Sequence, residues 1–351
     1  MNRSTVRPMK IAAFSLAAGL LLAATGCPNQ AHNESVTAAN AGSKAAGAKQ
    51  YDTAIAEYKK ATEKYHDNHL AWYGLGGALA AQSQWSASSD AFSTAVQLVP
   101  EQPMYNMWYG IALYEKAVQG AREDQAHKEN KKPEEITPDL TAVNFQTPLQ
   151  YLTQAVKLNA DMWRAHYYLG RIYREMDKPK DAADEFSKAL VANPRESGPY
   201  IALGELYNKW DYTDQAIAVS QKGTTFVPGS NEVADIWYEL GMGYSNKSMD
   251  KEAIDAFTKA IESRKDQHKA KFQRGQAYFH RGDFTDAKRD LEEFSKSAGA
   301  SVEFAKQQAS KMLMDIAAKA AGQAPPTGGP VSPEQLVNGK PGTPPKKKGG
   351  K

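Results

Sequence analysis

Glycine recurs at nearly fixed intervals along this chain of 351 residues. The position numbers of successive members of the series differ by 34, 34, 60, 34, 37 and 34. A glycine inside a helix costs about 1 kcal/mol relative to alanine, so a periodic glycine needs a packing reason. Stacked copies of one small unit supply that reason, and such arrays typically bind other molecules along a surface. The series is Gly42, Gly76, Gly110, Gly170, Gly204, Gly241 and Gly275.

Other residues keep a fixed distance from these glycines. Large residues flank the glycine at helical spacing, as in Trp72-x-x-Leu75-Gly76-x-x-Leu79. A small residue follows 12 positions later, and prolines close several units where a helix must stop. The pattern predicts two helices in each unit. Sixteen positions after the glycines, leaving out the irregular third unit, stand Tyr58, Phe92, Phe186, Ser220, Phe257 and Leu291.

This pattern resembles the tetratricopeptide repeat (TPR), with W-x2-L-G-x2-Y, then A-x3-F, then P. The resemblance covers residues 35–301. It implies an all-α fold, a right-handed superhelical solenoid of about seven helix-turn-helix repeats. Residues 302–321, with Phe304, Met312 and Ile316, are predicted to form an amphipathic helix that caps the C-terminal end.

The interval of 60 residues locates an insertion of 26 residues in the third unit, at about 115–141. This segment is dense in charge and contains Pro133 and Pro138. We expect the first helix of the unit to run on for several turns before a loop returns the chain. Two interpretations remain open, a contact site for a partner or a solvated decoration.

The N-terminus has the pattern of a secretory signal. Arg3, Arg7 and Lys10 precede an uncharged, mostly apolar stretch at 11–24. The following Ala24-Thr25-Gly26-Cys27 resembles the lipobox of bacterial lipoproteins, which implies removal of residues 1–26 and lipidation of Cys27. Cys27 is the only cysteine, so no disulfide can form within the chain. The alternative is ordinary secretory cleavage nearby.

These ends predict a lipid-anchored protein on the periplasmic face of a bacterial envelope, with 27–34 as a short tether. Pro28 stands where inner-membrane lipoproteins carry aspartate, which favours the outer membrane. The tail 322–351 is rich in Pro, Gly and Lys, and we expect it to be disordered and solubilising. The signal segment carries +3 and the tail +4, so the body between them carries −4 of the total +3. No basic face therefore favours nucleic acid.

The inner wall of a TPR array is formed by the first helix of each repeat. The resemblance places residues three before and one after the glycine in that wall, and also those six before and four after. A large, mostly apolar residue precedes each glycine by three positions, which suggests a groove for a peptide, with core packing as the alternative. These residues are Tyr73, Met107, Tyr167, Ile201, Tyr238 and Phe272.

Three arginines in the fourth unit add positive charge to this predicted groove. Arg164, Arg171 and Arg174 lie within about 80° on one helical face, around Tyr167. They suit a carboxylate or another anion of a partner, or they form a solvated face.

No catalytic motif, nucleotide loop or metal-ligand pattern stands out in the sequence. His66 and His69 have no third ligand nearby in the sequence. We therefore predict a scaffold without enzymatic activity, cofactor or metal, which holds envelope proteins in an assembly. TPR lipoproteins that assist secretin assembly or gather peptidoglycan enzymes resemble it in architecture. The alternative is an envelope enzyme or small-ligand-binding protein that uses the charged insertion or the three arginines.

Overall fold

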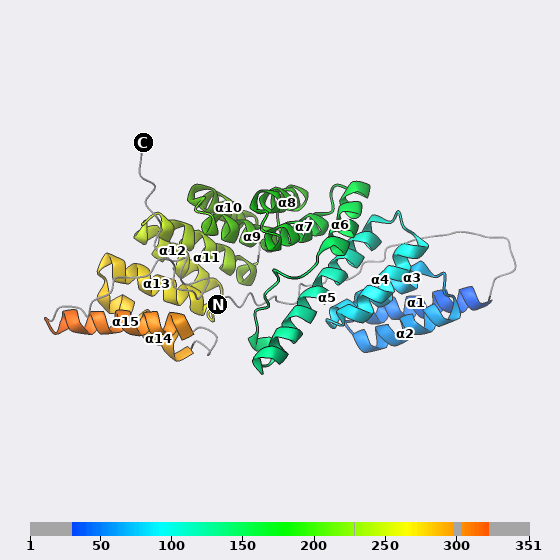
Figure 1. Ribbon diagram of the computed structural model, residues 1–351, viewed down its shortest axis with the longest axis horizontal. Coiled ribbons are helices and arrows are strands. Elements are labelled where there is room, and N and C mark those ends of the chain that lie inside the picture. Colours follow the sequence, from blue (N-terminus) through cyan, green and yellow to red (C-terminus); the bar gives the residue numbers. More distant parts are fainter. Residues whose placement is uncertain (1–29, 228, 298–302, 323–351) are drawn as a thin grey trace. The chain divides into compact units, whose positions relative to one another are not determined.

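The protein is helical throughout the residues that its computed structural model describes, which are 30–227, 229–297 and 303–322. Fifteen α-helices and one short 3-10 helix follow one another in these ranges, with no strand among them (Figure 1). The chain divides into two compact units between residues 192 and 193. The predicted all-α repeat fold is confirmed. The predicted signal segment, Cys27 and the tail from residue 323 lie outside the described residues.

The N-terminal unit consists of helical hairpins, in which α1 packs on α2, α3 on α4, α5 on α6 and α7 on α8. A single apolar core runs from α3 to α7 within this unit. The helices are α1 (Gln30–Gly47), α2 (Tyr51–Lys64), α3 (His69–Ala81), α4 (Trp85–Leu98), α5 (Pro103–Glu129), η1 (Pro133–Glu135), α6 (Gln146–Leu158), α7 (Trp163–Glu175) and α8 (Pro179–Ala192).

The C-terminal unit repeats the arrangement with three hairpins and a last single helix. This last helix, α15, buries Ala309, Met312 and Ile316 against Phe272 and Phe294, and so covers an apolar face of the preceding hairpin. The helices are α9 (Ser197–Lys209), α10 (Thr213–Phe226), α11 (Ser230–Asn246), α12 (Asp250–Ser263), α13 (His268–Arg281), α14 (Phe284–Ser297) and α15 (Glu303–Ala320).

The periodic glycines lie where the two helices of a hairpin approach most closely. A Cβ on Gly76 of α3 would stand 2.7 Å from the ring of Phe92 on α4. Gly170 faces Phe186 and Gly241 faces Phe257 at 2.6 and 2.5 Å in the same way. Since carbon atoms at these distances overlap, only glycine lets the ring of the second helix lie flat on the backbone of the first.

The turn inside each regular hairpin also repeats. Seven positions after the glycine, one residue has a positive φ, between 54° and 89°, which lets the chain reverse in two or three residues. The third hairpin has no such residue at this position, because α5 continues through it. The positive-φ residues are Lys49, Ser83, Asp177, Asp211, Ser248 and Gly282.

The inserted segment of the third repeat is mostly ordered structure. Helix α5 extends over 27 residues, and Asn130 ends it in the left-handed conformation. The returning chain then packs on the extension, since Ile136 is buried and the Asp139 amide donates to Gln125 Oε1 at 2.9 Å. The segment therefore forms a structured arm of the N-terminal unit (Figure 1).

The start of the first repeat corrects the sequence analysis. Helix α1 begins at Gln30, inside the range 27–34 that was assigned to the tether. Local bonds hold these residues in the helix, since Gln30 donates to Glu34 and Glu34 pairs with Lys64 of α2 at 2.7 Å. Polar composition alone indicated a tether, whereas the contact with α2 makes the segment helical.

The close approach can be tested with a matched pair of glycines. We expect Gly76→Ala to destabilise the protein by about 2 kcal/mol or more, because the new methyl group overlaps the Phe92 ring. Gly120→Ala, in the same kind of helix but with no atom within 4 Å of its Cβ, should stabilise by about 0.5–1 kcal/mol. Urea unfolding of both variants measures the two changes. Equal effects would contradict a packing role for the periodic glycine.

Candidate protein-binding surface

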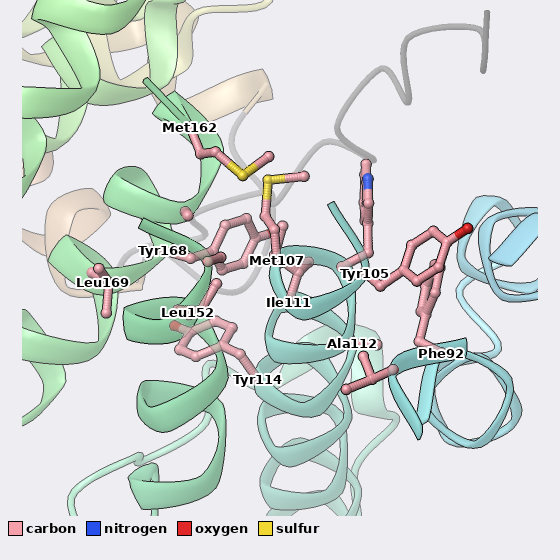
Figure 2. Packing of buried hydrophobic residues seen from close by; sticks show 14 of the residues in the cluster. Phe92, Tyr105, Met107, Ile111, Ala112, Tyr114, Leu152, Met162, Tyr168 and Leu169 are labelled. Carbon is pink, nitrogen blue, oxygen red and sulfur yellow. The ribbon is translucent and has the colours of Figure 1, made fainter. Parts of the chain in front are cut away.

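Half of the large residues that stand three positions before the glycines are internal. Tyr73, Met107 and Phe272 are exposed by only 8%, 2% and 3%, whereas Tyr167, Ile201 and Tyr238 are half-buried. Figure 2 shows Met107 directed toward Met162 at the start of α7. The prediction that these residues line an open groove is therefore wrong for Tyr73, Met107 and Phe272, and core packing is correct for them.

The reason is a contact that recurs within the hairpins. In three hairpins the ring three positions before the glycine lies against the ring sixteen positions after it, on the second helix of the hairpin. The ring centroids are 5.8 Å apart for Tyr73–Phe92, 5.8 Å for Tyr167–Phe186 and 5.9 Å for Tyr238–Phe257. Such tilted pairs stabilise cores. The ring of the second helix thus needs an apolar neighbour beside the glycine. The residue three positions before the glycine is that neighbour.

The three arginines of the predicted positive cluster have different surroundings. Arg171 is 9% exposed, and its Nη1 donates to Glu115 Oε1 of α5 at 2.9 Å. Arg174 bonds the adjacent Glu175, and the Arg164 guanidinium lies over the Trp163 ring at 4.2 Å. The prediction of one exposed cluster of three guanidinium groups is wrong, because Arg171 is enclosed between α5 and α7.

The buried ion pair is reinforced by two tyrosines, both visible in Figure 2. Tyr168 donates to the same Glu115 oxygen at 2.8 Å, and the Arg171 guanidinium lies 4.6 Å from the Tyr114 ring centroid. Burial raises the pKa of Tyr168 well above its ordinary value, and the neighbouring Glu115 adds to the increase. Burial opposes the charge of Arg171, but Tyr114 and Glu115 outweigh it and raise the pKa of Arg171. The ion pair and the Tyr168 hydrogen bond join α5 to α7.

Replacing Arg171 tests this structural role. We expect Arg171→Leu to cost about 3–5 kcal/mol of unfolding free energy, because it leaves Glu115 buried without its cation. The control Arg174→Leu should cost less than about 1 kcal/mol, since its ion pair with Glu175 is partly exposed. Thermal melting of the two variants distinguishes them. An unchanged melting temperature in Arg171→Leu would restore the hypothesis of a binding cluster.

An apolar stripe that the sequence analysis did not single out lies on the first helices of the N-terminal unit. Val36 of α1, Leu70 of α3 and Met104 of α5 are 39%, 41% and 39% exposed. They lie one repeat length apart, each six positions before its glycine, so the repeat places them on equivalent sides of successive hairpins. The signal was present in the sequence, because this position belongs to the inner wall of a TPR array. The stripe consists of Val36, Leu70 and Met104.

Clustered metal ligands and long apolar helices are absent from the described residues. In the three ranges 30–227, 229–297 and 303–322, His, Cys, Asp and Glu form no group of three or more that could hold a metal ion. His69 bonds the Tyr105 hydroxyl at 2.6 Å, and His66 lies near Asp67 and Trp72. Among the described helices, none has the length and apolarity to span a membrane.

Stacked helical hairpins, all but one closed by a periodic glycine against a large side chain of the second helix, define an α-helical repeat protein. Tetratricopeptide-repeat profiles match the sequence at residues 40–103, 163–196, 234–267 and 251–293. The chain therefore carries tetratricopeptide repeats, as the glycine pattern predicted. The fold of this family is that of protein-binding scaffolds.

The relatives of the chain are distant. A TPR repeat-containing protein of Methanocaldococcus jannaschii is 22% identical over 228 residues, which cover 60% of this chain and 40% of the relative. Among solved structures, the Cut9–Hcn1 hetero-tetramer of the APC/C superposes with a TM-score of 0.52 at 13% identity, over 74% of this chain and 48% of that one. A tetratricopeptide repeat protein of Parabacteroides merdae gives 0.50 at 11% identity, over 80% and 98%. At these identities the likeness shows the fold alone.

Proposed function

We propose that this protein is an adaptor that binds proteins of a bacterial envelope and assists the assembly of a periplasmic or outer-membrane complex. A lipid at Cys27 would anchor it to the membrane, more readily the outer than the inner one. The observation that carries the proposal is the stripe of Val36, Leu70 and Met104. Three successive repeats expose a large apolar side chain at the same position, which is costly in water unless another surface covers it.

The spacing of the stripe suits an elongated partner. Packed helices lie roughly 8–10 Å apart. One apolar residue per repeat therefore gives a row of side chains that are about this distance from one another. Side chains seven positions apart on a helix are about 10.5 Å apart, which matches that row. We infer that the partner contributes an amphipathic helix, whose apolar face lies along the stripe.

The alternative, an enzyme or small-ligand-binding protein, loses its two candidate sites. Arg171 is already paired with Glu115 inside the N-terminal unit. The inserted segment is a helical arm whose returning chain packs on α5, and Glu129 within it pairs with Lys131 at 2.7 Å. These internal pairings favour the adaptor over the alternative.

Charged substitutions in the stripe test the binding surface. We expect Leu70→Asp combined with Met104→Asp to reduce recovery of crosslinked envelope partners by about tenfold or more, because an apolar contact would have to bury a carboxylate. The melting temperature should change little, since both side chains are about 40% exposed. The measurement is quantitative pull-down from crosslinked envelopes.

The matched control is Val191→Asp in α8, which alters a side chain of the same unit that is 87% exposed and outside the stripe. It should leave partner recovery unchanged. Equal recovery with the stripe variant and the wild type would contradict the proposed surface. Recovery of no stoichiometric partner by any version would favour the small-ligand alternative.

The anchor has its own test. Cys27→Ser removes the thiol that the lipid would modify, so the protein should move from the membrane fraction to the soluble periplasmic fraction. Fractionation and immunoblotting measure the change, and the stripe variant serves as a control that keeps Cys27. Unchanged membrane association of Cys27→Ser would contradict lipidation.

A further inference from the structure

One hairpin lacks the contact on which the others are built. In α10, Ser220 stands where the other second helices carry Tyr, Phe or Leu, and Gly223 replaces the usual small side chain one turn later. Ser220 is fully buried, so a hydroxyl group occupies a core position. The α9–α10 hairpin therefore has no large side chain of α10 to fill the space beside Gly204.

A carboxyl-bearing side chain from the next hairpin fills part of this space. A Cβ on Gly204 would lie 3.0 Å from Glu239 Cβ of α11 and 3.0 Å from Ser220 Oγ. The other six periodic glycines instead face a ring or leucine of their own hairpin. Glu239 is 9% exposed. In this hairpin the ring of Tyr200 on α9 lies on Gly223 of α10, where a Cβ would stand 2.8 Å from it, and the Cβ and Cγ of Glu239 on α11 lie beside Gly204.

Asn208 binds Glu239, and other polar groups of the α9–α10 hairpin are unpaired in the described part of the chain. Asn208 of α9 donates from Nδ2 to Glu239 Oε2 and to the Glu239 carbonyl oxygen, both at 3.0 Å. Three buried oxygens of the same hairpin have no hydrogen-bond partner within the described residues. None of the three bonds the Glu239 carboxyl, to which Asn208 donates. The three oxygens are Tyr200 Oη, Asn208 Oδ1 and Ser220 Oγ.

The electrostatic surroundings of Glu239 favour the neutral form of its carboxyl group. Burial, and after it the charges of Glu205 on α9 and Asp235 on α11, raise the pKa of Glu239 to about 8. The bond from Asn208 and the charge of Lys269 on α13 act in the opposite direction. On the side of α12, Lys259 lies over the Trp237 ring of α11, two residues before Glu239.

We propose that the α9–α10 hairpin is a pH-sensitive joint of the C-terminal unit. Neutral Glu239 takes the place of the missing ring and holds α9 and α10 against α11. Ionisation places a buried carboxylate near the like charge of Glu205, and the hairpin loosens. The neighbouring α11–α12 hairpin, closed by Phe257 on Gly241, has no such group at this position and does not respond.

The direction of the effect follows from proton linkage. A glutamate in the unfolded chain titrates near 4.5, so between pH 4.5 and about 8 the folded hairpin retains a proton that the open form releases. Stability of the hairpin is therefore greatest below pH 4.5, falls as pH rises through this range, and is constant above it. The equilibrium between closed and open forms changes by at most about tenfold for each pH unit.

Hydrogen exchange of the full chain from pH 6 to 9, corrected for the intrinsic exchange rate, tests the joint. Protection of amides in α9 and α10 should fall by about tenfold or more between pH 6 and 8 and then level off. In Glu239→Gln the protection should not depend on pH. In Glu205→Gln the fall should move to lower pH, because a like charge is removed, and a purely structural role for Glu239 would not produce that displacement.

Helices α13 and α14 are joined by the contact of Leu291 with Gly275, so their amides serve as the internal control and should keep their protection. The proposal is overturned if the wild-type profile of α9 and α10 is flat, or if Glu239→Gln retains the wild-type profile. It is also overturned if the Glu239 carboxyl titrates near 4.5 by NMR. The single variants Ser220→Phe and Glu239→Ala should each lose protection, and the double variant should recover it. If the losses of the two single variants add in the double variant, the two side chains do not share the space beside Gly204.

Discussion

The close contact between a glycine backbone and a large side chain of the paired helix is the constraint on which the structure depends. In the regular hairpins a ring such as Phe92 is held between Gly76 on one side and Tyr73 on the other. A single ring thus joins both helices of its own hairpin and fixes their separation. Because this unit cannot bury its remaining apolar face alone, neighbouring hairpins must stack to complete the core.

This use of apolar residues inside the hairpins determines what remains for recognition. The residues three positions before the glycine support the ring, so they are drawn into the core. One position per repeat remains exposed and apolar in the first three hairpins, and it forms the stripe of Val36, Leu70 and Met104. In the fourth hairpin the equivalent position is Arg164, which lies over Trp163. The stripe therefore ends within the N-terminal unit.

The departures from the repeat have individual structural solutions. The insertion lengthens α5, and its return segment packs back on the helix, so the long interval adds an arm and leaves the hairpin contact between Gly110 and Leu152 intact. The buried pair of Arg171 and Glu115 joins α7 to α5 beside it. In α10 the loss of the ring at Ser220 is compensated by Glu239, a group whose charge depends on pH.

The sequence by itself determined the repeat and the helical hairpins, because a regular glycine period with small and aromatic residues at fixed offsets records a local contact within one unit. It also located the insertion. Only the tertiary structure decided which helix faces are covered. Tyr73 and Arg171 have the spacing of surface residues on their own helices, yet a partner on another helix, Tyr105 for the first and Glu115 for the second, encloses them. Burial depends on such contacts between helices distant in the chain, and periodicity along a single helix does not contain that information.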